Sequence, residues 1–283
     1  MATLQLDPAT LNAMRQLLQG KNRKWATPGD MAQHLDPDTI QTPALQLIDQ
    51  TLIDTTNTTD GRAIITLPPQ EGKSQRVSRR YPLWTLTHNP NTRIAIVSYS
   101  HAVARRWGRT IRDDITTHPD LGLTIRPDLS AQHEWQLAKA QGGVYTTGIG
   151  GSLTGRPVDL LIIDDPIKDR EQADSTIYRN RVWDWWTDVA STRLAPGAPV
   201  ILILTRWHQD DLAGRLLNAP DGHRWKLLNI PAQAETSNDP LGRKPGQWLQ
   251  SARGRTEAQW EAIKRQAGSR TFASLYQGHP SPP

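Results

Sequence analysis

The chain has 283 residues, with 33 Lys and Arg against 28 Asp and Glu, which gives a formal net charge of +5. This length is enough for one large α/β domain with a full core, and the basic balance permits a nucleic-acid partner without requiring one. The sequence has no Cys, which excludes disulfides, a thiolate nucleophile and a Cys-ligated zinc site. It also has no apolar run near the ~18 residues of a membrane span, and residues 1–7 do not resemble a secretory signal.

The first elements in chain order are expected to be helical. Spaced apolar residues over 1–20 predict a first helix, Thr27-Pro28 is expected to open a loop, and Thr42-Pro43 begins a second helix that reaches Ile53. The polar stretch 54–61 predicts a boundary. We therefore expect an N-terminal helical segment over residues 1–56 and a P-loop ATPase domain over residues 57–283, the second on the evidence that follows.

From Arg62 onward, apolar strands alternate with helical stretches. Continuous Val, Ile and Leu strands that alternate with helices predict a mostly parallel α/β sheet covered on both faces. The expected strands cover 63–67, 93–98, 143–147, 159–163, 200–204 and 225–230, and the expected helices cover 73–87, 100–117, 170–192, 209–217 and a last one that begins at the capping box of Thr256 and Gln259.

A loop that ends in Gly72-Lys73-Ser74 follows the first of these strands. This strand–loop–helix context is the one that a phosphate-binding loop requires. Backbone N–H groups at the helix start point at an anion, Lys73 can reach the β- and γ-phosphates, and the Ser74 hydroxyl can hold Mg²⁺. The full pattern has Gly where this chain has Leu67, so a strand that ends in a proline-stiffened turn is the alternative interpretation.

Two acids, Asp164 and Asp165, stand at the end of the apolar run Leu160–Ile163. Parallel sheets place their ligand sites at the carboxyl ends of the strands. Phosphoryl transfer needs one carboxylate to hold Mg²⁺ and one group to orient or deprotonate water, and Asp164 and Asp165 suit these two tasks in turn. An Asp-Pro turn that only ends the strand is the alternative, and the presence of the Gly-Lys-Ser loop favours the nucleotide site.

A third apolar strand, residues 200–204, delivers Thr205 to the same edge of the sheet. A hydroxyl there can contact the γ-phosphate or the attacking water. Asp210 and Asp211 follow and favour a helix N-terminus.

Three stretches, PPQEGKS, GGSLTGRPVDLLIIDDPIKDREQADS and ILILTRWHQDDLAGRLL, together resemble the ATPase domain of the terminase large subunit of tailed phages. The ending TFASLYQGHPSPP resembles the segment that closes that domain, so the resemblance covers Thr42–Pro283. It implies a P-loop NTPase core of the RecA-like, ASCE type that uses ATP to package viral DNA into a preformed capsid.

The resemblance also implies roles for individual residues. It assigns Asp165 to water activation and Thr205 to the coupling of hydrolysis to movement. Family members bind adenine with residues upstream of the phosphate loop, which makes Gln46 and Gln41 candidates; the alternative is that both are ordinary surface glutamines. Mg²⁺ is assigned to Ser74 and Asp164, and the phosphates of ATP to Pro69, Gln70, Glu71, Gly72, Lys73 and Ser74.

This sequence departs from the family at two places. Many members have Arg and His where this chain has Gln70 and Glu71, and Gln cannot supply the positive charge that senses the γ-phosphate. Another arginine must supply it, and Arg156, entering from a neighbouring subunit, is the candidate; its rivals are Arg79, Arg80 and Arg206. The catalytic acid is often Glu in related ATPases, which makes Glu171 an alternative to Asp165.

The implied partners are double-stranded viral DNA, the portal protein and the terminase small subunit. The implied assembly is a homo-oligomeric ring on the portal, located in the cytoplasm of the infected host and without a membrane. An arginine stripe on the expected helix 100–117 is either a contact for the DNA backbone or solvated surface. Its members are Arg105, Arg106, Arg109 and Arg112.

Full-length members of the family also carry an RNase H-like nuclease built on clustered acids. After Asp239 this chain has only Glu257 and Glu261 as acids, so we expect it to hold the motor half alone. Two alternatives stay open. A helicase of the same class would need a second RecA-like domain, and in a non-enzymatic ATP-binding subunit Leu67, Gln70 and Asp165 would mark a decayed site.

Overall fold

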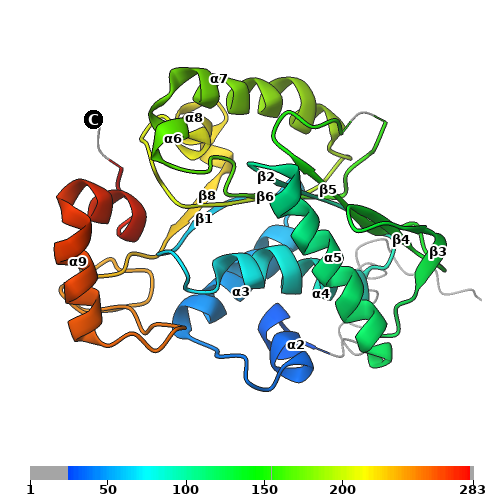
Figure 1. Cartoon of the computed structure of the whole chain (residues 1–283), viewed down its shortest axis with the longest axis horizontal. Coiled ribbons are helices and arrows are strands. Elements are labelled where there is room, and N and C mark those ends of the chain that lie inside the picture. The colour runs from blue at the N-terminus through cyan, green and yellow to red at the C-terminus, as the bar shows by residue number, and fades with distance from the viewer. Residues whose placement is uncertain (1–24, 154, 281–283) are drawn as a thin grey trace, which may run out of the picture.

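The computed structural model describes residues 25–153 and 155–280. Its centre is an eight-stranded sheet in the order β3-β4-β5-β2-β6-β7-β1-β8, with helices on both faces (Figure 1). Neighbouring strands from β5 to β8 are parallel, and β3 and β4 add an antiparallel edge. This confirms the predicted α/β fold. The helix expected over 1–20 lies outside the described residues.

The strand predictions agree with the structure wherever the strand is buried. Residues 93–98 and 200–204 form β2 and β7 with the expected bounds, whereas β3 and β4 were missed, because β3 is an edge strand without a buried residue and β4 is only four residues long. The strands are β1 Arg62–Thr66, β2 Arg93–Ser98, β3 Ile125–Ser130, β4 Glu134–Leu137, β5 Gly143–Gly148, β6 Leu160–Asp164, β7 Val200–Leu204 and β8 Lys226–Asn229.

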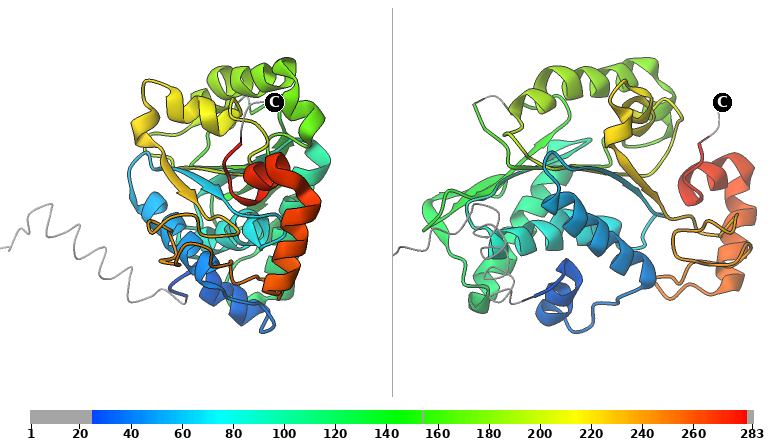
Figure 2. Two further views of the ribbon diagram at one scale, coloured as in Figure 1. Left: turned by 90° about the vertical axis from the view of Figure 1, so that its left-hand side faces the viewer. Right: turned by 180° about the vertical axis from the view of Figure 1, so that it is seen from behind.

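The helices form two layers around the sheet. One face carries α2 Pro28–Leu35, α3 Pro43–Asn57, α4 Tyr81–His88 and α5 His101–Thr117, and the other carries α6 Arg170–Asp174, α7 Thr176–Asp184 and α8 Leu212–Asn218 (Figures 1 and 2). The last helix, α9 Glu257–Thr271, stands beside the β8 edge with the long loop that precedes it.

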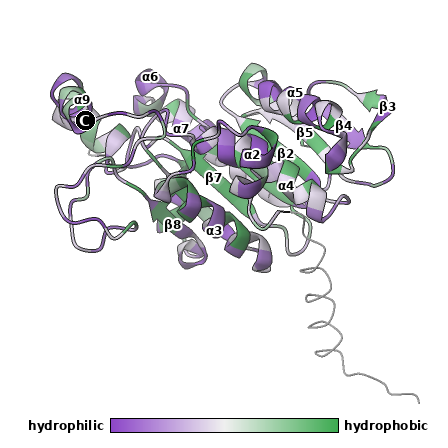
Figure 3. Ribbon diagram, turned by 90° about the horizontal axis from the view of Figure 1, so that it is seen from below, coloured by the Kyte–Doolittle hydropathy of each residue, from purple (hydrophilic) through white to green (hydrophobic). Residues whose placement is uncertain are grey.

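Each face of the sheet has its own hydrophobic core, because successive side chains of a strand point to opposite faces. In β1, Ile65 belongs to the core that also contains residues of α3, α4 and α5, whereas Ile64 belongs to the core that contains residues of α7 and α8. β2 divides in the same way between Ile96 and Val97. Seen by hydropathy, the central strands are mostly hydrophobic, whereas the edge strand β3 is mixed (Figure 3). Burial on both faces is the reason that these strands are continuous apolar runs.

Two predicted helices differ in detail from the structure. The helix after the Gly-Lys-Ser loop is formed by a π-helical stretch, Gln75–Arg80, that continues into α4. The expected helix 170–192 is divided into α6, α7, a further π-helical stretch over Trp185–Ala190 and a short 3₁₀ turn. The first break is at Ser175, whose backbone is extended with φ −76° and ψ 116°.

The loop expected at Thr27-Pro28 is wrong, because α2 begins there. The Thr27 hydroxyl accepts a hydrogen bond from the Asp30 N–H at 3.0 Å, and the Asp30 carboxylate accepts from the Thr27 N–H at 2.9 Å. This is a capping box, and Pro28 occupies the first helical position, where its missing N–H costs nothing. α2 and α3 share the core of β1, and the predicted domain boundary at residue 56 stays a prediction. Among the described residues, no helix has both the length and the apolar character needed to cross a membrane.

Candidate active site

The three predicted motifs meet at one edge of the sheet. β7 lies between β6 and β1, so the carboxyl ends of these parallel strands deliver Asp165, Thr205 and the Gly72-Lys73-Ser74 loop side by side. The Asp165 Oδ1 accepts from the Thr205 N–H at 2.7 Å and from the Lys73 Nζ at 3.3 Å. The strand order therefore brings together residues that are far apart in sequence.

The loop before the helix has the backbone of a turn. Gln70 and Gly72 have φ values of 66° and 90°, and the second of these requires glycine because a side chain there would be strained. Leu67, which stands where the usual motif has Gly, is 3% exposed and packs in the core with β1. The residue that departs from the motif therefore packs in the core, and the Gly-Lys-Ser end of the loop keeps its place.

Asp164 is a buried carboxylate held by two hydroxyls. The Ser74 Oγ donates to its Oδ1 at 2.9 Å, and the Ser78 Oγ donates to its Oδ2 at 2.8 Å. Burial, together with the neighbouring charge of Asp165, raises the pKa of Asp164 to about 6. A carboxylate whose negative charge is so poorly compensated suits a divalent cation.

Asp165 is fixed by its backbone as well as by its side chain. Its N–H donates to the Ile203 carbonyl at 2.9 Å, and its carbonyl accepts from the Tyr99 N–H at 3.1 Å, so the ends of β2 and β7 clamp it. Its φ of 46° lies in the left-handed region, which Asp tolerates better than most residues. This clamped turn directs the carboxylate of Asp165 toward Lys73 and Thr205, away from the two serines that hold Asp164.

A cleft of about 680 Å³ opens over these residues. One wall is the connection between α2 and α3, including Thr39 and Ile40, the latter 53% exposed. Gln41 lies behind this wall, where its amide oxygen accepts from Arg76 at 2.6 Å and its amide nitrogen donates to Asp49 at 3.0 Å. Gln46 is exposed on α3 and is not among the described residues that line the cleft, so its role in adenine binding stays a prediction.

The Glu71 side chain points away from the cleft. It is 2% exposed, and its carboxylate accepts from the Ser251 Oγ at 2.9 Å and from the Ala252 N–H at 2.6 Å, besides an ion pair with Arg255. Any part that Glu71 has in phosphate binding therefore rests on its backbone, since the carboxylate joins the loop to the C-terminal segment.

Arg79 and Arg80 line the cleft, and all three rival arginines already have carboxylate partners. Arg79 makes a bidentate pair with Asp114, with distances of 2.7 and 2.8 Å, and Arg80 bonds the same carboxylate at 3.3 Å. Arg206 is buried and donates to Asp211 at 2.6 Å, and Asp211 in turn caps α8. Each of the three arginines is therefore part of an ion pair within the fold.

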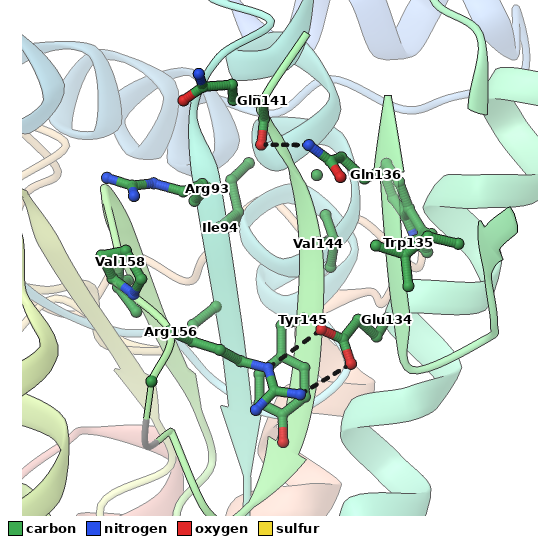
Figure 4. Close-up of a pocket in the computed structure, with 15 residues that line it drawn as sticks. Arg93, Ile94, Glu134, Trp135, Gln136, Gln141, Val144, Tyr145, Arg156 and Val158 are labelled. Atoms are coloured by element: carbon green, nitrogen blue, oxygen red, sulfur yellow. Dashed lines mark hydrogen bonds and ion pairs between the residues drawn. The ribbon is translucent and has the colours of Figure 1, made fainter. Parts of the chain in front are cut away.

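Arg156 lies in a different pocket, of about 220 Å³, between β4, β5 and the loop before β6 (Figure 4). Its guanidinium makes a bidentate ion pair with Glu134 at 3.0 and 3.1 Å and lies over the Tyr145 ring, 4.3 Å from the centroid. The hydrogen bonds that Arg156 donates to the Glu134 carboxylate raise the pKa of Arg156. Within one chain, Arg156 therefore does not line the cleft.

The remaining candidates lie on the surface. Glu171 is exposed on α6 and does not line the cleft. Arg105, Arg106 and Arg109 are exposed on α5, whereas Arg112 is half-buried and donates to the Ser130 carbonyl at 3.0 Å. The stripe is therefore free for a partner at three of its four positions.

Sequence reasoning missed two residues of this site. Ser78 follows Ser74 by one helical turn and so shares its face, a spacing that was available as a signal. Arg253 lines the cleft from the loop before α9, and no local pattern in the sequence points to it.

The family comparison covers most of the chain. Residues 64–270 match the family described as terminase large subunit, T4likevirus-type, N-terminal. No curated protein matches the sequence at a significant level.

Solved structures of low sequence identity share the fold. The large terminase of bacteriophage HK97 aligns with a TM-score of 0.57 and 17% identity over 85% of this chain and 51% of its own. A mutant ATPase domain of the Thermus phage P74-26 large terminase aligns with a TM-score of 0.56 and 11% identity over 90% of this chain and 100% of its own. The large terminase of a thermophilic bacteriophage, in complex with ATP-γ-S, aligns with a TM-score of 0.50 and 11% identity over 83% of this chain and 51% of its own.

The present chain thus spans about half the length of the HK97 terminase. The family match takes in β6, β7 and most of β1, together with the loops that follow them. On this match, the chain belongs to the T4likevirus-type terminase large subunit family, in its N-terminal region.

Proposed function

We propose that this chain is an ATP-hydrolysing motor domain whose turnover drives viral double-stranded DNA into a procapsid. The observation that carries the proposal is the meeting of Lys73, Asp165 and Thr205 around one cleft at the ends of three adjacent parallel strands, with Asp164 hydrogen-bonded to the cleft residue Ser74. The fold likeness to a terminase that was solved with ATP-γ-S supports ATP as the nucleotide.

The phosphates would lie on the loop that ends in Gly72-Lys73-Ser74, with the adenosine toward Thr39 and Ile40. Lys73 would exchange its 3.3 Å contact with Asp165 for the β- and γ-phosphates. The Ser74 hydroxyl and the Asp164 carboxylate would hold Mg²⁺, because these oxygens already face each other and Lys73 offsets only part of the buried charge of Asp164 and its neighbour Asp165. When bound, Mg²⁺ would neutralise charge on the phosphates, and Ser78 would hold Asp164 in position.

Hydrolysis would use Asp165 as the group that orients and deprotonates water. The water oxygen would form a bond to the γ-phosphorus as the bond to the ADP oxygen breaks, and the water proton would pass to the Asp165 carboxylate. The products would be ADP and phosphate. Since the Thr205 N–H holds the same carboxylate, a shift at the end of β7 would accompany the change in charge, which supports the proposed coupling role of Thr205.

The partners follow from the family and from charge. The exposed arginines 105, 106 and 109 on α5 offer a surface for a DNA backbone. Portal protein, terminase small subunit and a homo-oligomeric ring on the portal complete the proposed machine, which would work in the cytoplasm of the infected host.

The test is phosphate release from ATP with Mg²⁺, measured with and without double-stranded DNA. We expect turnover by the wild-type chain and none by a Lys73→Ala chain that still unfolds cooperatively, because the variant lacks the charge that would bind the β- and γ-phosphates. Equal turnover by a folded Lys73→Ala chain would overturn the site. ATP binding without turnover would indicate a non-enzymatic subunit, and ATP-driven strand separation would indicate a helicase.

A further inference from the structure

The loop before α9 crosses the end of the phosphate loop and is fixed there. Glu71 binds Ser251, the Ala252 backbone and Arg255, and the Arg255 guanidinium also donates to the Gln70 amide oxygen at 3.2 Å. Arg255 in turn lies 5.2 Å from the centre of the Trp260 ring. Residues 251–255 are therefore held against the loop that is proposed to bind phosphate.

Arg253 lies in the middle of this fixed segment. Its N–H donates to the Ser251 Oγ at 3.0 Å, which sets its backbone, and its side chain lines the cleft together with Gln70, Lys73 and Thr205. The side chain is exposed and is therefore reachable by a ligand in the cleft.

Most positive charges that line the cleft already face a carboxylate. Arg79 and Arg80 bind Asp114, and Lys73 and Arg76 bind Asp165 and Asp49. Over residues 25–153 and 155–280, Arg253 is the one cationic side chain lining the cleft for which no hydrogen bond or ion pair of the charged group is found. It is the cation that can bind an added anion without breaking an existing pair.

We propose that Arg253 supplies, within its own subunit, the positive charge that Gln70 does not, and that it binds the terminal phosphate of ATP in the cleft. This inference rests on the proposed ATPase function and names a further catalytic residue for it. The transition state spreads negative charge over the equatorial oxygens of the transferred phosphoryl group, and a planar guanidinium can contact two of them at once.

Arg255 and Arg156 are less suited to this task. Arg255 is committed to Glu71 and Gln70, so it acts as a positioning residue for the segment that carries Arg253. Arg156 is committed to Glu134 in a separate pocket.

The experiment compares Arg253→Ala and Arg253→Lys with Arg265→Ala, a control that removes an exposed arginine from α9, outside the cleft. The measurements are the affinities for Mg²⁺–ATP-γ-S and Mg²⁺–ADP, the kcat and KM for ATP, and the thermal unfolding midpoint. Loss of an arginine that acts on the transferred phosphoryl group lowers kcat by ~10³-fold or more.

We expect Arg253→Ala to show this loss in kcat, a preference for ATP-γ-S over ADP that is at least about tenfold weaker, and an unchanged affinity for ADP. Arg253→Lys should recover part of the ATP-γ-S preference, because it keeps the charge without the fork. The control should behave as the wild type. An Arg253→Ala chain with wild-type unfolding, kcat and nucleotide preference would overturn the proposal.

The two nucleotides also separate this inference from the proposed function. A wild-type chain that hydrolyses ATP, with an Arg253→Ala chain that does so equally well, would refute Arg253 alone. A wild-type chain that binds both nucleotides without turnover would refute the ATPase, and the affinity ratio of Arg253→Ala would still decide whether Arg253 binds the γ-phosphate. No binding of either nucleotide would refute both.

Discussion

Replacing Glu71 by Gln tests the contact that joins the phosphate loop to the C-terminal segment. The change keeps the shape of the side chain and one acceptor oxygen but removes the negative charge. The carboxylate is 2% exposed and holds Ser251, the Ala252 N–H and Arg255, whose side chain is 19% exposed. The substitution therefore leaves a mostly buried guanidinium without its counter-charge.

The expected loss of stability follows from these contacts. Removing one partner of a buried ion pair costs ~3–5 kcal/mol. Arg255 is only partly buried, keeps its contact with the Trp260 ring and can still bond the new amide, which favours a smaller loss. A hydrogen bond to a charged group is worth ~1.5–3 kcal/mol, and we expect Glu71→Gln to lower the free energy of unfolding by about 2–3 kcal/mol.

Urea unfolding measures this loss as a lower midpoint at an unchanged m-value. Glu261→Gln on α9 is the matched control and should change the free energy of unfolding by less than about 0.5 kcal/mol. A double-mutant cycle of Glu71→Gln with Arg255→Gln should give a coupling energy of about 1 kcal/mol or more, since the two side chains touch. A Glu71→Gln chain as stable as the control, or a cycle without coupling, would refute the reasoning.

Three further predictions concern the acids and Arg156. In a nucleotide-binding assay, Asp164→Asn should weaken Mg²⁺-dependent ATP binding. In a phosphate-release assay, Asp165→Asn should still bind ATP but lose ~10²–10⁴-fold in turnover. Normal turnover by Asp165→Asn would refute its proposed role in activating water. Burial raises the pKa of Asp211 to about 6 from 3.8, so between these values the folded chain binds a proton at Asp211 that the unfolded chain releases. In urea unfolding, the stability of the wild type relative to Asp211→Asn should therefore fall as the pH rises from 4 to 6. A rise in relative stability would contradict the raised pKa of Asp211. Because Arg156 pairs with Glu134, Arg156→Ala should keep its ATP turnover. If Arg156→Ala is instead inactive and regains activity when it is mixed with Lys73→Ala, Arg156 acts on the nucleotide of a neighbouring subunit.

The buried strands of the fold were predictable because a continuous apolar run in the sequence indicates a strand that is buried on both faces. β2 and β7 are covered on both faces, and their apolar runs end where the strands end. β3 follows a different rule, because it is an edge strand with mostly exposed or half-buried residues, and such a strand has the composition of a loop. The helix break at Ser175 was also missed, since helical spacing continues on both sides of it.

The residue types that form the site were predictable from the sequence, but which of these residues lie next to one another was not. Lys73 lies in the loop after the apolar strand β1, and Asp164 and Asp165 lie at the end of the apolar strand β6, which is a local signal. Their adjacency depends on β7 entering between β6 and β1, and strand order is a property of the whole chain. Arg253 lines the cleft from a loop that Glu71 holds, and no local pattern in the sequence predicts this contact between distant segments.

The contact between Glu71 and Arg255 also sets an order of events during synthesis. The two residues are 184 positions apart, so the ribosome makes the phosphate loop long before it makes the segment that holds it. At ~5–20 residues per second this interval lasts roughly 10–40 s. A nascent chain therefore presents the Gly72-Lys73-Ser74 motif early, but its cleft acquires the wall that carries Arg253 only after the segment around Arg255 has been made.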